Sequence, residues 1–279
     1  MTAPGAPVGR LTVCPTPIGN LADITLRALE ELGAADVIAC EDTRRTRVLL
    51  DRHGVSAKGL VSLHEHNEAG RARELTARIR AGDHVVLVSD AGTPLVSDPG
   101  HALLRECLLA GLPVEVLPGP SAAVTALVAS GLPSARWCFA GFLPRKKGEL
   151  RELLAGAAET LVAYESPRRT AATLALLAEL DPERPVAVCR ELTKLHEEVA
   201  RGSAAELAER YRGEEVRGEV TLVIGGAPQG AARSLQDALA ALRELTAAGA
   251  RPRPAAGAIA RLTGFGANQL YRELTGAAE

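Results

Sequence analysis

The sequence predicts an α/β protein made of two α/β domains and a small C-terminal helical appendage. Three observations predict this fold class. Short apolar runs alternate with helical patterns in the first part of the chain, which is typical of a parallel sheet covered by helices. The pattern changes near Gly131-Leu-Pro133, where a second set of strand-like runs begins. From Ser234 onward the periodicity is helical.

The first domain is predicted to span residues 10–130, after a disordered stretch over residues 1–9 that is rich in Pro, Gly and Ala. Its strands are expected at Leu11 to Cys14, Asp36 to Cys40, Leu60 to Leu63, His84 to Ser89 and Pro113 to Leu117. One apolar helical stripe follows the first strand, formed by Leu21, Ile24, Ala28 and Leu32. Gly33 is predicted to end this helix as its C-cap. A helix of small residues is expected over Ser121 to Ser130.

The second domain is predicted to span residues 131–226, with a hinge to the first domain around Gly131. Its strands are expected at Arg136 to Leu143, Thr160 to Glu165, Pro185 to Arg190 and Glu219 to Ile224, with a further short strand at Glu197 to Arg201. Helices are expected over Pro167 to Leu180 and Ser203 to Tyr211. The segment from Pro144 to Gly148 is predicted to be a basic loop.

The third part, residues 227–279, is predicted to be a linker followed by helices. Ser234 is expected to N-cap a helix that runs to about Ala248. The segments Pro254 to Leu262, Thr263 to Gly266 and Ala267 to Leu274 have the spacing of a helix-turn-helix unit. The alternative is a plain helical hairpin that packs on the body or on a partner subunit, and the sequence leaves both open.

Composition narrows the classes of protein. The net charge of −2 gives no global signal for nucleic-acid binding. The apolar runs are too short to span a bilayer, so no membrane partner is expected. The five cysteines lie far apart without a C-x-x-C pair, which argues against zinc. Their odd number, without a signal peptide, indicates a cytoplasmic protein. His64 and His66 flank Glu65, but no third ligand is evident, so no metal is predicted.

Three loops rich in Pro and Gly follow strands of the first domain. They are Pro15 to Asn20, Asp90 to Gly100 and Pro118 to Ala123. Because ligands bind at the carboxyl ends of strands in open α/β sheets, we expect these loops to form a binding site. None contains G-x-G-x-x-G or a P-loop, so a nucleotide held by its phosphates is not indicated.

Six blocks of sequence together resemble the tetrapyrrole methylase superfamily, in its branch that methylates ribosomal RNA. The blocks are Pro15 to Thr25, Glu41 to Arg44, Val88 to Pro94, Leu117 to Pro120, Tyr164 to Ser166 and Arg190 to Lys194. The resemblance implies two α/β domains with a cofactor cleft between them. It also implies methyl transfer from S-adenosylmethionine to the ribose 2′-hydroxyl of a cytidine in the decoding region of 16S rRNA. Naked 16S rRNA and the small ribosomal subunit both stay open as substrates, and a homodimer is expected.

Candidate site residues come from this resemblance and from the predicted strand ends. Cofactor binding is assigned to Pro17, Asp90, Ala91, Gly92, Thr93, Ser121 and Ala122, with Tyr164 and Thr221 as candidates from the second domain. The general base is left open among Glu165, Glu191, Lys194, Glu41 and Asp42. Binding of RNA phosphates is assigned to Arg44, Arg145, Lys146, Lys147, Arg251 and Arg253.

Two other functions are compatible with parts of this pattern. One is methylation of a small tetrapyrrole, a precorrin or porphyrin, by the same fold. The other is a non-catalytic nucleic-acid-binding protein that uses the helix-turn-helix. Binding of S-adenosylmethionine distinguishes the last from both enzymes.

Overall fold

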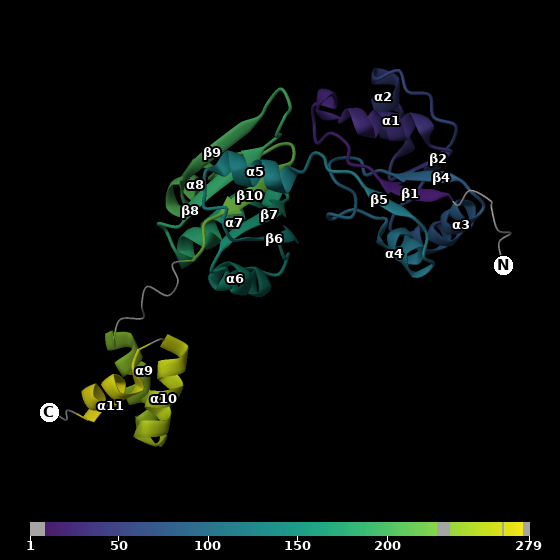
Figure 1. Ribbon diagram of the computed structural model, residues 1–279. Helices are drawn as coiled ribbons and strands as arrows, with labels where there is room; N and C mark the ends of the chain where they lie inside the picture. The colour runs from purple at the N-terminus through teal and green to yellow at the C-terminus, as the bar shows by residue number, and fades with distance from the viewer. Residues whose placement is uncertain (1–8, 228–234, 264, 276–279) are drawn as a thin grey trace. The chain divides into compact units, whose positions relative to one another are not determined.

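The computed structural model describes residues 9–227, 235–263 and 265–275 (Figure 1). The described residues form two compact units. The larger contains the chain up to Leu153 and Thr160–Gly225, and the smaller contains Leu154–Glu159 and the chain from Gly226 onward. The α/β fold class predicted from the sequence is confirmed by two five-stranded sheets with helices and by the C-terminal helices.

The first sheet is parallel throughout and has the strand order β3-β2-β4-β1-β5. Its strands are β1 (Arg10–Val13), β2 (Val37–Cys40), β3 (Leu60–Ser62), β4 (His84–Leu87) and β5 (Val114–Val116). Helices α1 (Leu26–Ala34) and α2 (Thr43–Arg52) lie on one face, and α3 (Glu68–Arg80) and α4 (His101–Leu109) on the other (Figure 1). Each face has its own apolar core, as strands that are apolar at consecutive positions require.

The prediction of one helix from Leu21 to Gly33 is wrong at both ends. Two caps divide the segment, because Asn20 accepts a hydrogen bond from Ala22 N and starts a 3₁₀ helix, η1 (Leu21–Asp23). Thr25 then accepts from Ala28 N and starts α1. Gly33 lies inside α1, which ends at Ala34 with an extended residue following it, so no left-handed glycine is needed.

The second sheet is mixed and has the strand order β6-β7-β10-β8-β9. Its strands are β6 (Trp137–Phe142), β7 (Thr160–Glu165), β8 (Pro185–Arg190), β9 (Glu198–Ser203) and β10 (Val220–Ile224). Its helices are α6 (Lys147–Gly156), α7 (Pro167–Leu180) and α8 (Ala204–Arg210). The predicted basic loop is wrong beyond Lys146, since α6 begins there and Leu150 N donates to Lys146 O over 3.0 Å.

Helix α5 (Ala122–Ser130) packs against the second sheet although it follows the last strand of the first. Its buried Ala126 and Leu127 lie in one core with Val162 and Val223 of that sheet. The helix ends at Gly131, whose φ of 73° suits glycine. Arg201 of β9 donates from Nε to Ser130 O over 3.2 Å. The predicted domain boundary at residue 131 and its hinge stay predictions.

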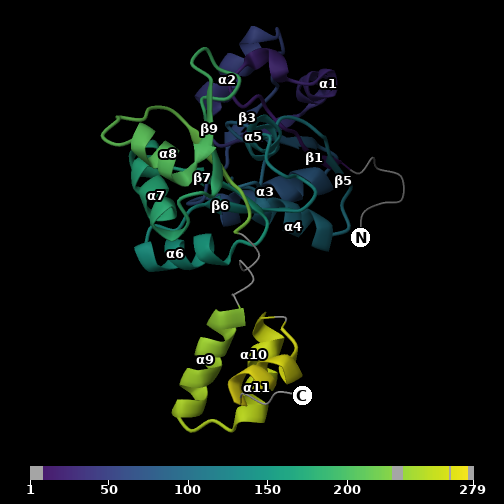
Figure 2. The ribbon, with the colours of Figure 1, turned by 90° about the vertical axis from the view of Figure 1, so that its left-hand side faces the viewer.

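The smaller unit contains α9 (Leu235–Ala247), α10 (Pro252–Thr263) and α11 (Ala267–Thr275). Figure 2 shows these helices packed side by side, around a core that includes Leu242, Ile259 and Leu270. The helices expected in this part of the chain are thus confirmed, with ends shifted by a few residues. Ser234, predicted as an N-cap, and residues 1–8 lie outside the described residues. The helix-turn-helix and the plain hairpin remain alternatives.

Candidate cofactor and active site

Three loops meet at the carboxyl end of the first sheet because they follow β1, β4 and β5, which are neighbours in the sheet. Thr16 N donates to Gly92 O over 2.9 Å, and Gly92 N donates to Thr16 O over 3.0 Å. Thr93 Oγ1 donates to Pro120 O over 3.0 Å. Gly119 approaches Pro15 so closely that a Cβ on Gly119 would lie 2.7 Å from Pro15 Cβ. These contacts hold the loops as one rigid rim.

A cavity of about 340 Å³ opens beside this rim. Its walls also include strand ends of the second sheet and the chain before β10. Of the residues predicted to bind a cofactor, those lining it are Ala91, Gly92, Thr93, Ser121, Ala122, Tyr164 and Thr221. These residues contribute small side chains, hydroxyls and one phenol to the cavity wall, which suits an amphipathic small molecule. Their binding roles stay predictions.

Pro17 and Asp90 line a neighbouring hollow of about 280 Å³ instead, together with Arg45 and Lys194. The two hollows share Ile18, Ala91 and Glu219 in their walls. Asp90 Oδ1 accepts a hydrogen bond from Asp42 N over 3.0 Å, and Asp90 Oδ2 lies 3.5 Å from Arg45 Nη1. Asp90 thus links the loop after β4 to the start of α2.

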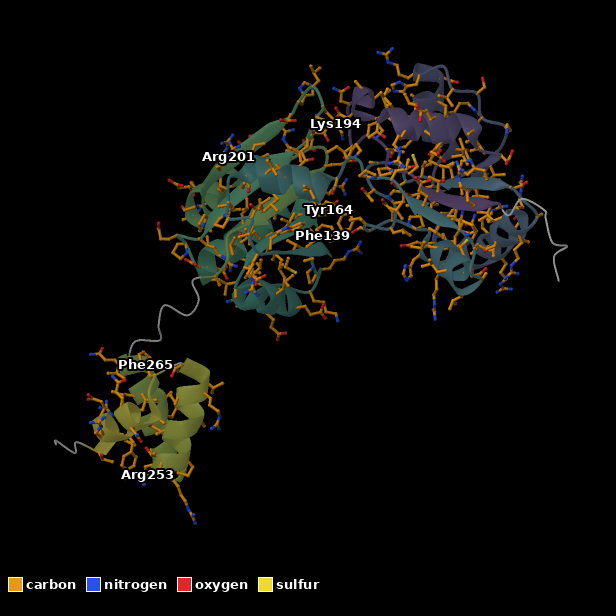
Figure 3. All side chains as sticks on the ribbon, in the orientation of Figure 1. Phe139, Tyr164, Lys194, Arg201, Arg253 and Phe265 are labelled. Atoms are coloured by element: carbon orange, nitrogen blue, oxygen red, sulfur yellow. The ribbon has the colours of Figure 1, made fainter. Side chains whose placement is uncertain are left out.

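Tyr164 forms an aromatic wall of the cavity. Its ring packs edge to face on Phe139 (both labelled in Figure 3), with ring centroids 5.0 Å apart. It packs in the same way on Phe142, with centroids 5.4 Å apart. Thr221 of β10 pairs with Tyr164 in the antiparallel register of the sheet, which is why both line the cavity. Burial, followed by the charge on Asp98, raises the pKa of Tyr164, so the phenol stays protonated at neutral pH.

Asp98 lines the same cavity and was not among the predicted site residues. Burial and the negative charge of Glu41 raise the pKa of its carboxyl group to about 6, against the effect of a hydrogen bond with the Ser89 side chain. Leu95 and Ser97, at φ of 73° and 70°, hold the loop before it in the left-handed region. The signal in the sequence was Asp98-Pro-Gly100, which closes a ligand loop just before a helix.

The first base candidate, Glu165, is buried and bonded at both carboxylate oxygens. Oε1 accepts from Ser166 N over 2.7 Å, and Oε2 accepts from Thr173 Oγ1 over 2.6 Å. Arg169 Nη2 lies 3.3 Å from Oε2. Glu165 therefore anchors the first turns of α7 to the end of β7.

Glu191 and Lys194 belong to one ionic network at the end of β8. Lys194 Nζ donates to Glu191 Oε1 over 2.8 Å and to Glu219 Oε2 over 3.0 Å. Burial alone would lower the pKa of Lys194, but the hydrogen bonds to the two carboxylates outweigh it and raise that pKa. The bond from Lys194 lowers the pKa of Glu191. The ammonium form of Lys194 is thus favoured, which disfavours this side chain as a proton acceptor.

Glu41 and Asp42 form the connection between β2 and α2 and differ in environment. Asp42 N-caps α2, and its bonds to Arg44 lower the pKa of Asp42 to about 2. Glu41 is largely exposed, yet partial desolvation and the charge on Asp90 raise its pKa. The two neighbours therefore differ strongly in affinity for a proton.

The cations predicted to bind RNA lie on both compact units. Arg44 Nη2 lies 2.7 Å from Asp42 Oδ2, and Lys146 Nζ lies 2.8 Å from Glu149 Oε1. Lys147 begins α6, and Arg145 precedes it in an exposed loop. Arg253 in the first turn of α10 stacks over Tyr271, 5.2 Å from the ring centroid, and Arg251 is exposed just before it. Their contacts with RNA stay predictions.

Two further questions raised by the sequence concern metals and membranes. Among the described residues, no three or more His, Cys, Asp or Glu side chains gather in a way that could hold a metal ion. His64 instead contacts Asn67, with Nε2 3.2 Å from Nδ2. No helix in the described ranges has both the length and the apolar character needed to cross a membrane.

Comparison with known proteins agrees with this architecture. A family model described as Tetrapyrrole (Corrin/Porphyrin) Methylases matches residues 10–208, and the chain belongs to this family. A uroporphyrin-III C-methyltransferase from Thermus thermophilus, solved in complex with S-adenyl homocysteine, shares the fold at 24% identity and a TM-score of 0.53. The match covers 78% of this chain and 97% of that one.

Two curated relatives identify the branch of the family. One from Mesorhizobium japonicum is 46% identical over 267 residues, covering 93% of this chain and 89% of the relative. One from Escherichia coli O157:H7 is 50% identical over 224 residues, covering 78% of each chain. Both are named Ribosomal RNA small subunit methyltransferase I, and this chain groups with them.

Proposed function

We propose that this protein transfers a methyl group from S-adenosylmethionine to 16S rRNA, at the ribose 2′-hydroxyl of a cytidine in the decoding region. The observation that carries the proposal is the identity of 46% and 50% with two relatives named Ribosomal RNA small subunit methyltransferase I. Three of the blocks on which the resemblance rests also contribute to the cavity wall, through Ile18, Ala91 to Thr93 and Tyr164 to Ser166. We also propose that the protein acts in the cytoplasm, where rRNA is available, and that it forms a homodimer.

The cavity is chemically suited to S-adenosylmethionine. Ala91, Gly92 and Ala122 leave apolar space for a flat base, and Tyr164 adds an aromatic wall. The hydroxyls of Thr93, Ser121 and Thr221 are available nearby for polar groups, although Thr93 already donates to Pro120 O. When bound, S-adenosylmethionine supplies a methyl group activated by a positively charged sulfur.

The chain's own residues would hold and orient the reactants. The bonded rim of Thr16, Gly92 and Thr93 keeps the cavity in shape without a closing motion of those loops. Such alignment can supply about 7–11 kcal/mol of a barrier. A residue that accepts the hydroxyl proton adds about 10²–10⁴-fold to the rate. Arg44, Arg145, Lys146 and Lys147 would contact phosphates of the RNA, as would Arg251 and Arg253 of the smaller unit.

The test is a map of ribose methylation on 16S rRNA from a deletion strain, its parent and the strain complemented with this chain. We expect one decoding-region cytidine to lose its 2′-O-methyl group in the deletion and to regain it on complementation. Purified 16S rRNA and small subunits from the deletion strain, each offered to the protein in vitro, identify the form of substrate that is methylated.

Other outcomes would contradict the proposal. An unchanged methylation map, with turnover on a porphyrinoid, would assign the protein to small tetrapyrroles. An unchanged map, with no binding of S-adenosylmethionine by calorimetry, would favour a non-catalytic nucleic-acid-binding protein.

A further inference from the structure

We propose that Asp98 is the proton acceptor of the methyl transfer. This inference rests on the proposed function and deepens it, because it assigns a role in the same cavity to a carboxylate outside the predicted site. The 2′-hydroxyl O–H bond breaks and its proton passes to a carboxylate oxygen of Asp98. The electron pair of that bond stays on the oxygen, which forms the new bond to the methyl carbon. The carbon–sulfur bond breaks at the same time and leaves its pair on sulfur.

The first argument is a comparison of the carboxylates that line the cavity, which are Asp98, Glu165 and Glu219. Glu165 is bonded at both oxygens by Ser166, Thr173 and Arg169. Glu219 forms an ion pair with Lys194, with Oε2 3.0 Å from Nζ. Asp98 forms no ion pair with any Lys, Arg or His in the described ranges. Of the three carboxylates, Asp98 is therefore the one with the fewest protein partners and the one most available to accept a proton from a substrate.

The second argument is the backbone that presents Asp98. Leu95 and Ser97 both have a left-handed φ, a conformation that non-glycine residues adopt at a cost. Gly100, at φ of 118°, completes the turn into α4, and a Cβ there would lie 2.6 Å from Leu87 Cδ2. The strained backbone before Asp98 and the tightly packed Gly100 after it fix the loop and so keep the carboxylate at the cavity wall.

The third argument is electrostatic. The charges of Glu41, from the loop after β2, and of Asp90, from its own loop, act on Asp98, and Asp98 in turn acts on Tyr164 of β7. None of them carries a positive charge at neutral pH, so none stabilises the carboxylate. A base is most effective when its pKa lies near the working pH, and the pKa of about 6 of Asp98 meets that condition.

The experiment compares the full-length wild-type protein with Asp98→Asn, which keeps the shape and an acceptor for Ser89. Single-turnover methylation of small subunits or 16S rRNA from the deletion strain is measured from pH 5 to pH 8.5. The wild-type rate should rise with pH, reach half of its maximum near pH 6 and level off about one pH unit higher. At pH 7.5 the rate of Asp98→Asn should be at least about 100-fold lower than that of the wild type. The variant should also lack the rise of rate with pH on the acidic side, which we call the acidic limb. Its dissociation constant for S-adenosylmethionine by calorimetry should stay within about threefold.

Two further variants refine the comparison. Glu41→Gln removes a negative charge beside Asp98, so the acidic limb should persist and move to lower pH. Asp51→Asn removes an exposed carboxylate of α2 outside both hollows and should leave the rate and the limb unchanged. Carbon-13 NMR of the Asp98 carboxyl group gives a readout independent of activity, with an expected midpoint near pH 6.

Several results would overturn the inference. An active wild-type protein with an Asp98→Asn rate within about threefold would do so, as would an NMR midpoint near pH 4. Recovery of the variant's rate at saturating S-adenosylmethionine would show that Asp98 binds the cofactor cation instead. An inactive wild-type protein on every form of rRNA would contradict the proposed function itself, and the assignment of the hydroxyl proton with it.

Discussion

Gly19 and Lys194 pack so closely that a Cβ on Gly19 would lie 2.5 Å from Lys194 Cγ. The contact joins the loop after β1 to the turn after β8, and Asn20 N also donates to Thr193 Oγ1 over 3.0 Å. Glu191 and Thr193, at φ of 50° and 66°, already hold that turn in the left-handed region. Because the turn after β8 already holds two non-glycine residues in the left-handed region, displacing it further has a cost in backbone energy.

The first prediction concerns Gly19→Ala. The added methyl group would also meet Thr193 Oγ1 at 2.7 Å, so the segments must move apart. Overpacking of this kind costs about 1–3 kcal/mol. We expect affinity for S-adenosylmethionine to fall about tenfold by calorimetry. Gly33→Ala is the matched control, since its nearest neighbour is Val55 Cγ1 at 3.9 Å and its site is inside α1. It should raise Tm slightly and leave affinity unchanged.

The second prediction concerns the bonded rim. Gly92 has φ of 82°, and a Cβ there would lie 3.4 Å from Ile18 Cγ2. Gly92→Val should therefore displace the loop and weaken S-adenosylmethionine binding. Asp90→Ala should weaken it as well, because Asp42 N loses its acceptor. Gly54→Val, at φ of 66° in open space, carries similar backbone strain away from the site. Wild-type affinity in folded Gly92→Val and Asp90→Ala would remove these loops from the cofactor site.

The third prediction concerns pH and stability at Asp98. Its pKa is raised from 3.8 to about 6 in the folded protein, so the folded state binds more protons than the unfolded state between these values. Stability from this group is therefore full below about pH 4 and is lost as pH rises through 6. The full difference corresponds to at most about 3 kcal/mol, and we expect about 1 kcal/mol because the carboxyl group is only partly buried.

Asp98→Asn should accordingly be more stable than the wild type at pH 8 and equal to it at pH 4. Urea unfolding of both proteins at the two pH values measures the difference. A variant that is less stable at pH 8 would show that the carboxylate has a favourable partner in the folded state.

The fourth prediction is that the protein forms a homodimer. Val124 and Val128 lie one turn apart on α5 and are 49% and 75% exposed, so they leave an apolar strip on the larger unit. Light scattering at micromolar concentration should give the mass of a dimer, and Val128→Glu should shift the mass toward the monomer. Leu109→Glu replaces an exposed leucine on α4 and should have no such effect. A fully active wild-type monomer would contradict the prediction.

The fifth prediction concerns RNA binding by the smaller unit. Truncation before Ser234 removes Arg251 and Arg253, and each lost single-strand phosphate contact should flatten the plot of log affinity against log salt by about 0.7. Calorimetry should show nearly unchanged cofactor affinity, because all cavity residues lie upstream. The double variant Arg251→Ala/Arg253→Ala should reproduce the change in slope, and Arg105→Ala on α4 serves as its control. Equal slopes for truncated and full-length protein would support a helical hairpin that only packs.

Local pattern was enough to predict most of the secondary structure. The strands at Thr160–Glu165 and Pro185–Arg190 and the helix at Pro167–Leu180 have the predicted bounds. The alternation of strands and helices also predicted the parallel first sheet. The prediction of one helix from Leu21 to Gly33 failed because the caps Asn20 and Thr25 divide the segment at its start, and because α1 continues past Gly33 to Ala34.

By itself, the sequence determined most of the elements, the position of the three loops rich in Pro and Gly, and the family, because periodicity, turn residues and ordered blocks are all local along the chain. Only the tertiary structure decided that α5 packs on the second sheet, that Glu165 and Lys194 are held by partners, and that Asp98 lines the cavity. Each of these depends on desolvation and on charges from residues far apart in sequence. The proton affinity of Asp98, for example, depends on burial and on Glu41, which belongs to a different loop.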